Sequence, residues 1–83
     1  MEDITAVVSD LLEQLAVARD VPVDAPPDRI VVSSLDQMRF LVGLEERLDA
    51  MLDVGDTLPF DLTSREALVK SVLTLLEESG YNG

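Results

Sequence analysis

Apolar residues recur at helical spacing in three segments of the chain, at about residues 3–18, 33–50 and 63–79. Within each segment they fall three and four positions apart, which places their side chains on one face of a helix. The positions predicted to form the core are Ile4, Val7, Val8, Leu11, Leu12, Leu15, Phe40, Leu41, Leu44, Leu48, Leu68, Val69, Val72, Leu73, Leu75 and Leu76. The pattern predicts a single all-α domain over residues 1–83, built as a bundle of three to four helices.

Two segments between the predicted helices lack this periodicity. Residues 20–30 contain Pro22, Pro26 and Pro27, which remove backbone donors and disfavour helix at the preceding residues, so a long first loop is expected. Its apolar residues, which we expect to hold the loop across the helices, are Val21, Val23, Ile30 and Val31. Residues 53–62 form a turn region, with room for one short helical turn.

Polar residues mark where the later helices begin and end. Ser33 and Asp36 match a capping box, in which the serine oxygen accepts a hydrogen bond from the amide three residues on. Thr63 and Glu66 give a second match at the start of the last helix. Gly80 is expected to end that helix, because glycine readily adopts the left-handed conformation found there.

The charge of the chain restricts its partners. Seventeen acidic residues against six basic ones give a formal net charge of −11. This field opposes binding to nucleic acid or to an anionic membrane and favours protein partners with basic surfaces. The chain has no apolar stretch of about 20 residues, and its first residues lack the basic start of a secretory signal. We therefore expect a cytoplasmic monomer.

The residue types argue against catalysis and metal binding. Histidine and cysteine are absent, so the chain has no Ser-His-Asp triad and no thiolate nucleophile. Lys70 is the only lysine and lies on a different helix from the candidate serine, which makes a Ser–Lys pair a poor hypothesis. The acids Asp49, Asp53 and Asp56 do not fit the register of a calcium-binding loop and read better as a solvated turn. The chain is predicted not to be an enzyme.

Ser34 is the candidate functional residue. It follows the long proline-containing loop and falls in the first turn of the second helix, beside backbone amides that have no partner within the helix. On local pattern alone an ordinary first-turn serine is the simpler interpretation.

The stretch SSLDQMRFLVGLEERL changes that balance, because it resembles the phosphopantetheine attachment region of acyl and peptidyl carrier proteins. Ser34-Leu35-Asp36 matches the Ser-Leu-Asp part of the family motif, and Leu44-Glu45-Glu46 falls at the spacing of its Leu-Glu-Glu. The likeness in detail covers residues 28–48, while the helical layout agrees over residues 4–79. Ser33 stands where the family usually has aspartate, and Val31 where glycine is common.

The resemblance implies a carrier domain with a 4′-phosphopantetheine arm, transferred from coenzyme A to Ser34 by a phosphopantetheinyl transferase. The arm would hold an acyl or aminoacyl unit as a thioester. Partners would be a loading enzyme, an acyltransferase or a synthase with a basic docking surface. The residues that would meet them are Leu35, Asp36, Met38, Arg39, Val42, Glu45, Glu46 and Asp49. Met38 and Val42 are equally well read as core residues, and the acids as a solvated face.

The cargo stays open among fatty acyl, polyketide, aminoacyl and D-alanyl units. Arg39 and Arg47 interrupt the acidic run common on this helix, which favours a free-standing carrier of polyketide or nonribosomal peptide biosynthesis, as in antibiotic pathways, over a fatty-acid carrier. The rival hypothesis is an acidic helical interaction module without a prosthetic group.

Overall fold

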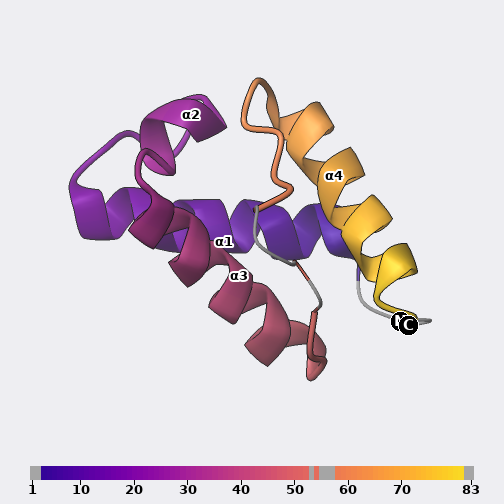
Figure 1. Ribbon diagram of the computed structural model, residues 1–83. Helices are drawn as coiled ribbons and strands as arrows, with labels where there is room; N and C mark the ends of the chain where they lie inside the picture. The colour runs from indigo at the N-terminus through magenta and orange to yellow at the C-terminus, as the bar shows by residue number, and fades with distance from the viewer. Residues whose placement is uncertain (1–2, 53, 55–57, 82–83) are drawn as a thin grey trace.

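The computed structural model describes residues 3–52, 54 and 58–81. Within these ranges the chain forms four helices, which are α1 (Ile4–Arg19), α2 (Pro27–Ile30), α3 (Ser34–Leu48) and α4 (Arg65–Glu78). Figure 1 shows α3 crossing α1, with α2 near one end of α1 and α4 near the other. The predicted all-α helical bundle is confirmed.

The core lies where α1 packs against the other three helices. Fifteen of the sixteen residues predicted from periodicity are buried or partly buried against this core, as are Val21 and Leu52 from the loops. The full buried set is Val7, Val8, Leu11, Leu12, Ala16, Ala25, Ile30, Val31, Phe40, Leu41, Leu44, Leu48, Leu52, Phe60, Leu68, Val72, Leu75 and Leu76. Leu73 differs from the prediction, because it points to solvent from the outer face of α4.

Side chains of small polar residues cap the three long helices at their first turns. The Asp3 carboxylate accepts from the Thr5 amide at the start of α1. Ser33 caps α3 in a complete capping box with Asp36, as predicted. The predicted box at Thr63 is wrong, because Ser64 accepts from the Ala67 amide and α4 begins one residue later. Only Thr63 has an acidic residue three positions on, but the structure uses the adjacent Ser64 oxygen as the cap.

The first loop contains one helical turn, α2, which was not predicted because the prolines of this segment favoured a loop. Pro27 begins α2, where its fixed backbone angle suits the first helical position and its missing N–H costs nothing. The side chains of Ile30, at the end of α2, and Val31 are fully buried as expected, whereas the Val23 side chain is about half exposed. Arg65 donates to the carbonyls of Val23 and Ala25, and so ties the start of α4 to this loop.

The second long connection is anchored by apolar side chains. Phe60 packs edge-on against Phe40, with ring centroids 5.0 Å apart. Leu52 is buried, and its amide donates to the Glu45 carboxylate at 2.9 Å. Of the segment 53–62, where a short helical turn was expected, residues 54 and 58–62 are described and form no helix, and Asp53 and Asp56 of the expected acidic turn lie outside the described residues.

Candidate functional site at the start of α3

Ser34 is the first residue of α3 and its side chain is exposed. The neighbouring Ser33 occupies the cap position, with its oxygen accepting from the Asp36 amide at 3.2 Å. No residue in the described part of the chain hydrogen-bonds to the Ser34 hydroxyl. The two serines therefore have separate roles, and the Ser34 oxygen is open to reaction without loss of the cap.

Asp36 fixes the helix start from the inside. One carboxylate oxygen, Oδ2, accepts from the amides of Val32 at 3.1 Å and Ser33 at 3.2 Å. The same oxygen accepts from Arg19 Nη1 at 3.0 Å, which joins the end of α1 to the start of α3. The residue is only 4% exposed. The expectation that Asp36 meets partner enzymes is therefore corrected, because its carboxylate is directed into this network and away from solvent.

The network also governs the ionisation of this carboxyl group. Burial by itself raises the pKa of Asp36, but the hydrogen bonds from the Val32 and Ser33 amides, the Arg19 charge and the Ser33 side chain act the other way. The result is a pKa below the ordinary value of 3.8. Asp36 is thus ionised near neutral pH and acts as a fixed anionic anchor.

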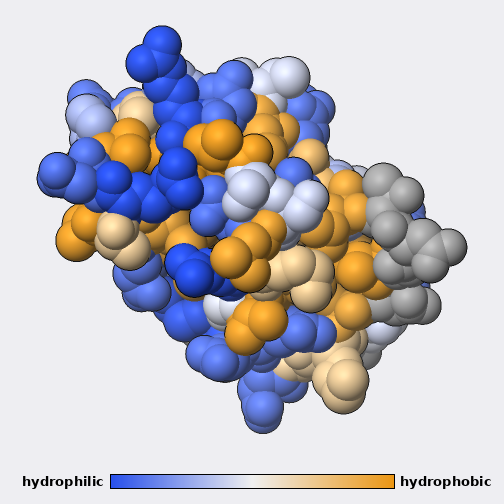
Figure 2. Space-filling view, turned by 60° about the vertical axis from the view of Figure 1, so that its left-hand side comes forward, coloured by the Kyte–Doolittle hydropathy of each residue, from blue (hydrophilic) through white to orange (hydrophobic). Residues whose placement is uncertain are grey.

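An exposed apolar stripe runs along α3 from the candidate serine. Leu35, Met38 and Val42 are 60%, 45% and 44% exposed, so they are surface residues and not core. Val32, immediately before the capping box, is 59% exposed and was not singled out from the sequence. Its position one turn before Leu35 was the available signal. Figure 2 shows hydrophobic surface of this kind lying in patches between hydrophilic side chains.

The charged candidates differ in how free they are. Glu46, Asp49 and Arg39 are exposed, whereas Glu45 is half-buried and its carboxylate accepts from the Leu52 amide. Glu45 therefore also holds the chain that follows α3. Arg47 pairs with Asp10 of α1 at 3.3 Å. Glu45 and Arg47 thus make contacts within the protein, whereas Arg39, Glu46 and Asp49 face solvent.

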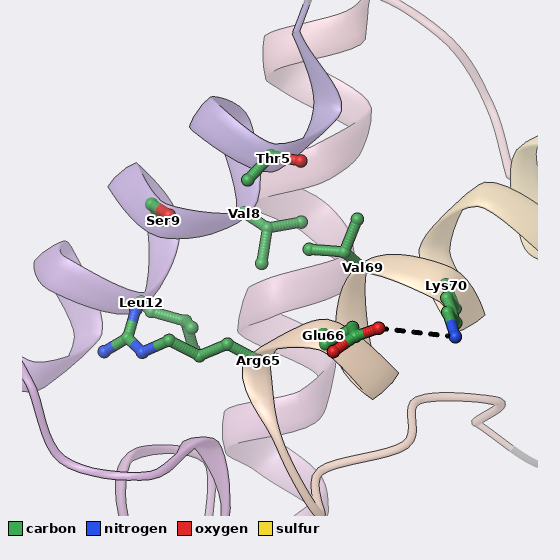
Figure 3. Close-up of a pocket in the computed structure, with 8 residues that line it drawn as sticks. All are labelled: Thr5, Val8, Ser9, Leu12, Arg65, Glu66, Val69 and Lys70. Carbon is green, nitrogen blue, oxygen red and sulfur yellow. Dashed lines mark ion pairs between the residues drawn. The ribbon is translucent and has the colours of Figure 1, made fainter.

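A separate hollow of about 400 Å³ lies between α1 and α4. Its floor is apolar, from Val8, Leu12 and Val69, and Lys70 pairs with Glu66 at 3.5 Å on its rim (Figure 3). Figure 3 shows the Thr5 and Ser9 hydroxyls on the α1 side, with no acid–base partner drawn beside them. None of its lining residues comes from α3, so Lys70 is not part of the Ser34 site.

The site is chemically simple. It offers one open hydroxyl on a rigid helix end, an apolar stripe beside it and charges of both signs farther along α3. Histidine and cysteine are absent from the sequence, so neither can activate this hydroxyl from within the chain. The fold and the site together define a small helical protein with an exposed serine at the start of α3.

No protein-family model, no curated protein and no solved structure matches this chain. None of the helices in the described ranges has the length and hydrophobicity that a bilayer crossing requires.

Proposed function

We propose that this chain is a carrier protein and not an enzyme, with 4′-phosphopantetheine attached through a phosphodiester to the oxygen of Ser34. The observation that carries the proposal is that the residues capping α3 are different from the exposed serine beside them. Ser33 and Asp36 satisfy the helix end, which leaves the Ser34 hydroxyl exposed and without a hydrogen-bond partner in the described chain. A bulky substituent can be added there without breaking a helix cap.

The attached arm supplies the chemistry that the chain lacks. Its terminal thiol holds an acyl or aminoacyl unit as a thioester, for use in polyketide or nonribosomal peptide assembly. Modification needs a phosphopantetheinyl transferase and coenzyme A, and delivery needs a loading enzyme, an acyltransferase or a synthase. Brief docking suits this task, since exposed ion pairs contribute only about 0–1 kcal/mol each.

Intact-mass measurement after incubation with coenzyme A and a broad-specificity transferase tests the proposal. The wild-type mass is expected to rise by about 340 Da, the mass of the arm. Ser34→Ala is expected to remove this rise while the helical circular dichroism is unchanged. Ser33→Ala is the matched control, because it removes the neighbouring hydroxyl and the cap but leaves the attachment oxygen. It should still be modified, with a stability loss of about 1 kcal/mol.

Two results contradict the proposal. Full modification of Ser34→Ala would move the attachment point elsewhere. An unmodified wild-type protein, under conditions in which a known carrier is fully converted, would favour the acidic interaction module without a prosthetic group.

A further inference from the structure

We propose that the groove between α1 and α3 binds an amphipathic helix of a partner protein that carries both an acidic and a basic side chain. The acidic group would lie against Arg39 and the basic group against Glu46, with apolar residues between them covering Leu35, Met38 and Val42. This inference does not require modification of Ser34, so it stands or falls separately from the carrier function.

The shape of the groove suits a helix. It has a volume of about 560 Å³ and extends along α3 from Leu35 to Glu46. At a rise of about 1.5 Å per residue this length is about 16 Å, or three turns of a partner helix. The α1 wall contributes Leu11, Leu15 and Ala18. Helix-in-groove recognition uses apolar anchors over such a distance.

Gly43 keeps this groove narrow at its base. A Cβ atom placed on Gly43 would lie 2.7 Å from the Leu11 Cδ2 atom of α1. The absence of a side chain therefore lets the two helices approach closely. The three exposed apolar side chains of α3 stand along one wall, where they are open to a partner.

The charges on the groove select the partner. Arg39 and Glu46 both line it, both are exposed, and neither has an ion-pair partner among the residues that the structure describes. They are two helical turns apart, about 10 Å. By contrast, Arg19, Arg47 and Lys70 are paired with Asp36, Asp10 and Glu66. A uniformly basic partner would place a cation against Arg39, so the favoured partner carries an acid there.

The hollow between α1 and α4 is a poorer docking surface. Its floor residues Val8 and Leu12 are almost fully buried, so they offer little apolar area to a partner. Its lysine is already paired with Glu66. The α1–α3 groove combines exposed apolar area with unpaired charges, and this combination singles it out.

Three synthetic 15-residue helical peptides test the proposal. They share one apolar face and differ only at two flanking positions seven residues apart, which are Glu and Lys, Lys and Lys, or Glu and Glu. Binding to the full chain is followed by fluorescence anisotropy at about 150 mM salt, where the Debye length of about 8 Å screens the long-range field of the chain. The uniform peptides present the same charges in either direction, whereas the Glu/Lys peptide matches both Arg39 and Glu46 only in the direction that places its Glu against Arg39.

The wild-type protein is expected to bind the Glu/Lys peptide about threefold more tightly than the Lys/Lys peptide, as one matched surface charge allows. Arg39→Glu should reverse this preference, so that the ratio of the two dissociation constants changes about tenfold. Arg29→Glu makes the same change of net charge at an exposed arginine of α2 and should leave the ratio within about twofold of wild type.

A second pair of variants tests the apolar contact. Val42→Gln should weaken binding of all three peptides at least about fivefold, since it removes one anchor from the groove. Leu73→Gln alters an equally exposed residue on α4 and should have no such effect. No saturable binding to wild type, equal effects of Arg39→Glu and Arg29→Glu, or equal effects of Val42→Gln and Leu73→Gln would each overturn the proposal. Equal binding by Ser34→Ala is expected, which separates this result from the test of the carrier function.

Discussion

At the residue scale, the candidate site depends on a carboxylate that does not face solvent. Asp36 lies two positions after Ser34, and its Oδ2 atom accepts from two backbone amides and from Arg19. The resemblance places an aspartate before the attachment serine, where this chain has Ser33. The structure shows the cap provided jointly by Ser33 and Asp36, which holds the start of α3 rigid beside the open hydroxyl.

Replacement of Asp36 by Asn should lower the free energy of unfolding by about 2 kcal/mol near pH 6, because buried donors lose an ionised acceptor. The difference from wild type should shrink in acid. The native pKa of Asp36 is lowered, so between 3.8 and that lower value the unfolded chain binds more protons than the native one. The contribution is complete above 3.8 and is lost as pH falls through the native pKa. Urea unfolding of both proteins at a series of pH values measures this.

Asp24→Asn serves as the control, since it removes one carboxylate from an exposed position of the first loop. Its difference from wild type should stay within about 0.5 kcal/mol at each pH. If the difference for Asp36→Asn were constant from about pH 6 to about pH 2.5, the ionised carboxylate would not be the stabilising group.

At the scale of the element, helices α1 and α3 end at aspartates in the left-handed conformation. Asp20 has φ 59° and Asp49 has φ 50°, while Gly80 has φ 78° after α4. Side chains with a Cβ atom are strained there, and a negative charge is unfavourable at the carboxyl end of a helix. Asp20→Gly should therefore raise the free energy of unfolding by about 0.5–1 kcal/mol in urea denaturation.

Asp24→Gly provides a matched comparison for this change. It removes the same charge and adds the same backbone freedom, but at a residue without a positive φ. It should lower stability, because glycine increases the entropy of the unfolded chain. A stabilisation of both variants would assign the effect to charge, and a destabilisation of both would show that Asp20 is not strained.

Local sequence patterns predicted the helices and their ends correctly where a single signal indicated them. Helical periodicity located all three long helices, the Ser33 box marked the start of α3, and Gly80 ends α4 with the expected backbone hydrogen bonds from Gly80 and Tyr81. Helix α2 was missed because the prolines of its segment argue for a loop as well as for a first helical position. The capping-box pattern favoured Thr63, because Glu66 follows it three residues later, but the cap of α4 is Ser64.

The sequence predicted part of the candidate site. What it left open or predicted wrongly has one cause, which is the packing of α1 against α3. The exposure of Ser34 and Leu35 follows from their place at a helix start. The burial of Asp36 depends on Arg19, seventeen residues earlier, and only the packing of α1 against α3 brings them together. The exposure of Met38 and Val42 likewise depends on which face of α3 is covered by α1.

At the scale of the whole molecule, the net charge of −11 opposes the compact state. The ion pairs Arg47–Asp10 and Lys70–Glu66 are exposed, so each adds little stability. The remaining acids repel one another over the surface, and α4 ends with Glu77 and Glu78 but has no basic residue in its last turn. The field of these acidic residues therefore acts against folding.

Salt should therefore stabilise this protein. Raising NaCl from about 20 mM to about 500 mM shortens the Debye length from about 20 Å to about 4 Å, which screens repulsion across the molecule more than it weakens the few exposed pairs. Thermal unfolding followed by circular dichroism should show a Tm that rises by several degrees, about 4–8 °C for each kcal/mol gained in a domain of this size.

The double variant Glu77→Gln and Glu78→Gln reduces the net charge from −11 to −9 and removes anions from the end of α4. It should start from a higher Tm at low salt and gain less from added NaCl. A Tm that falls with salt, or an equal gain in both proteins, would show that pairwise attraction outweighs the repulsion of the acidic surface.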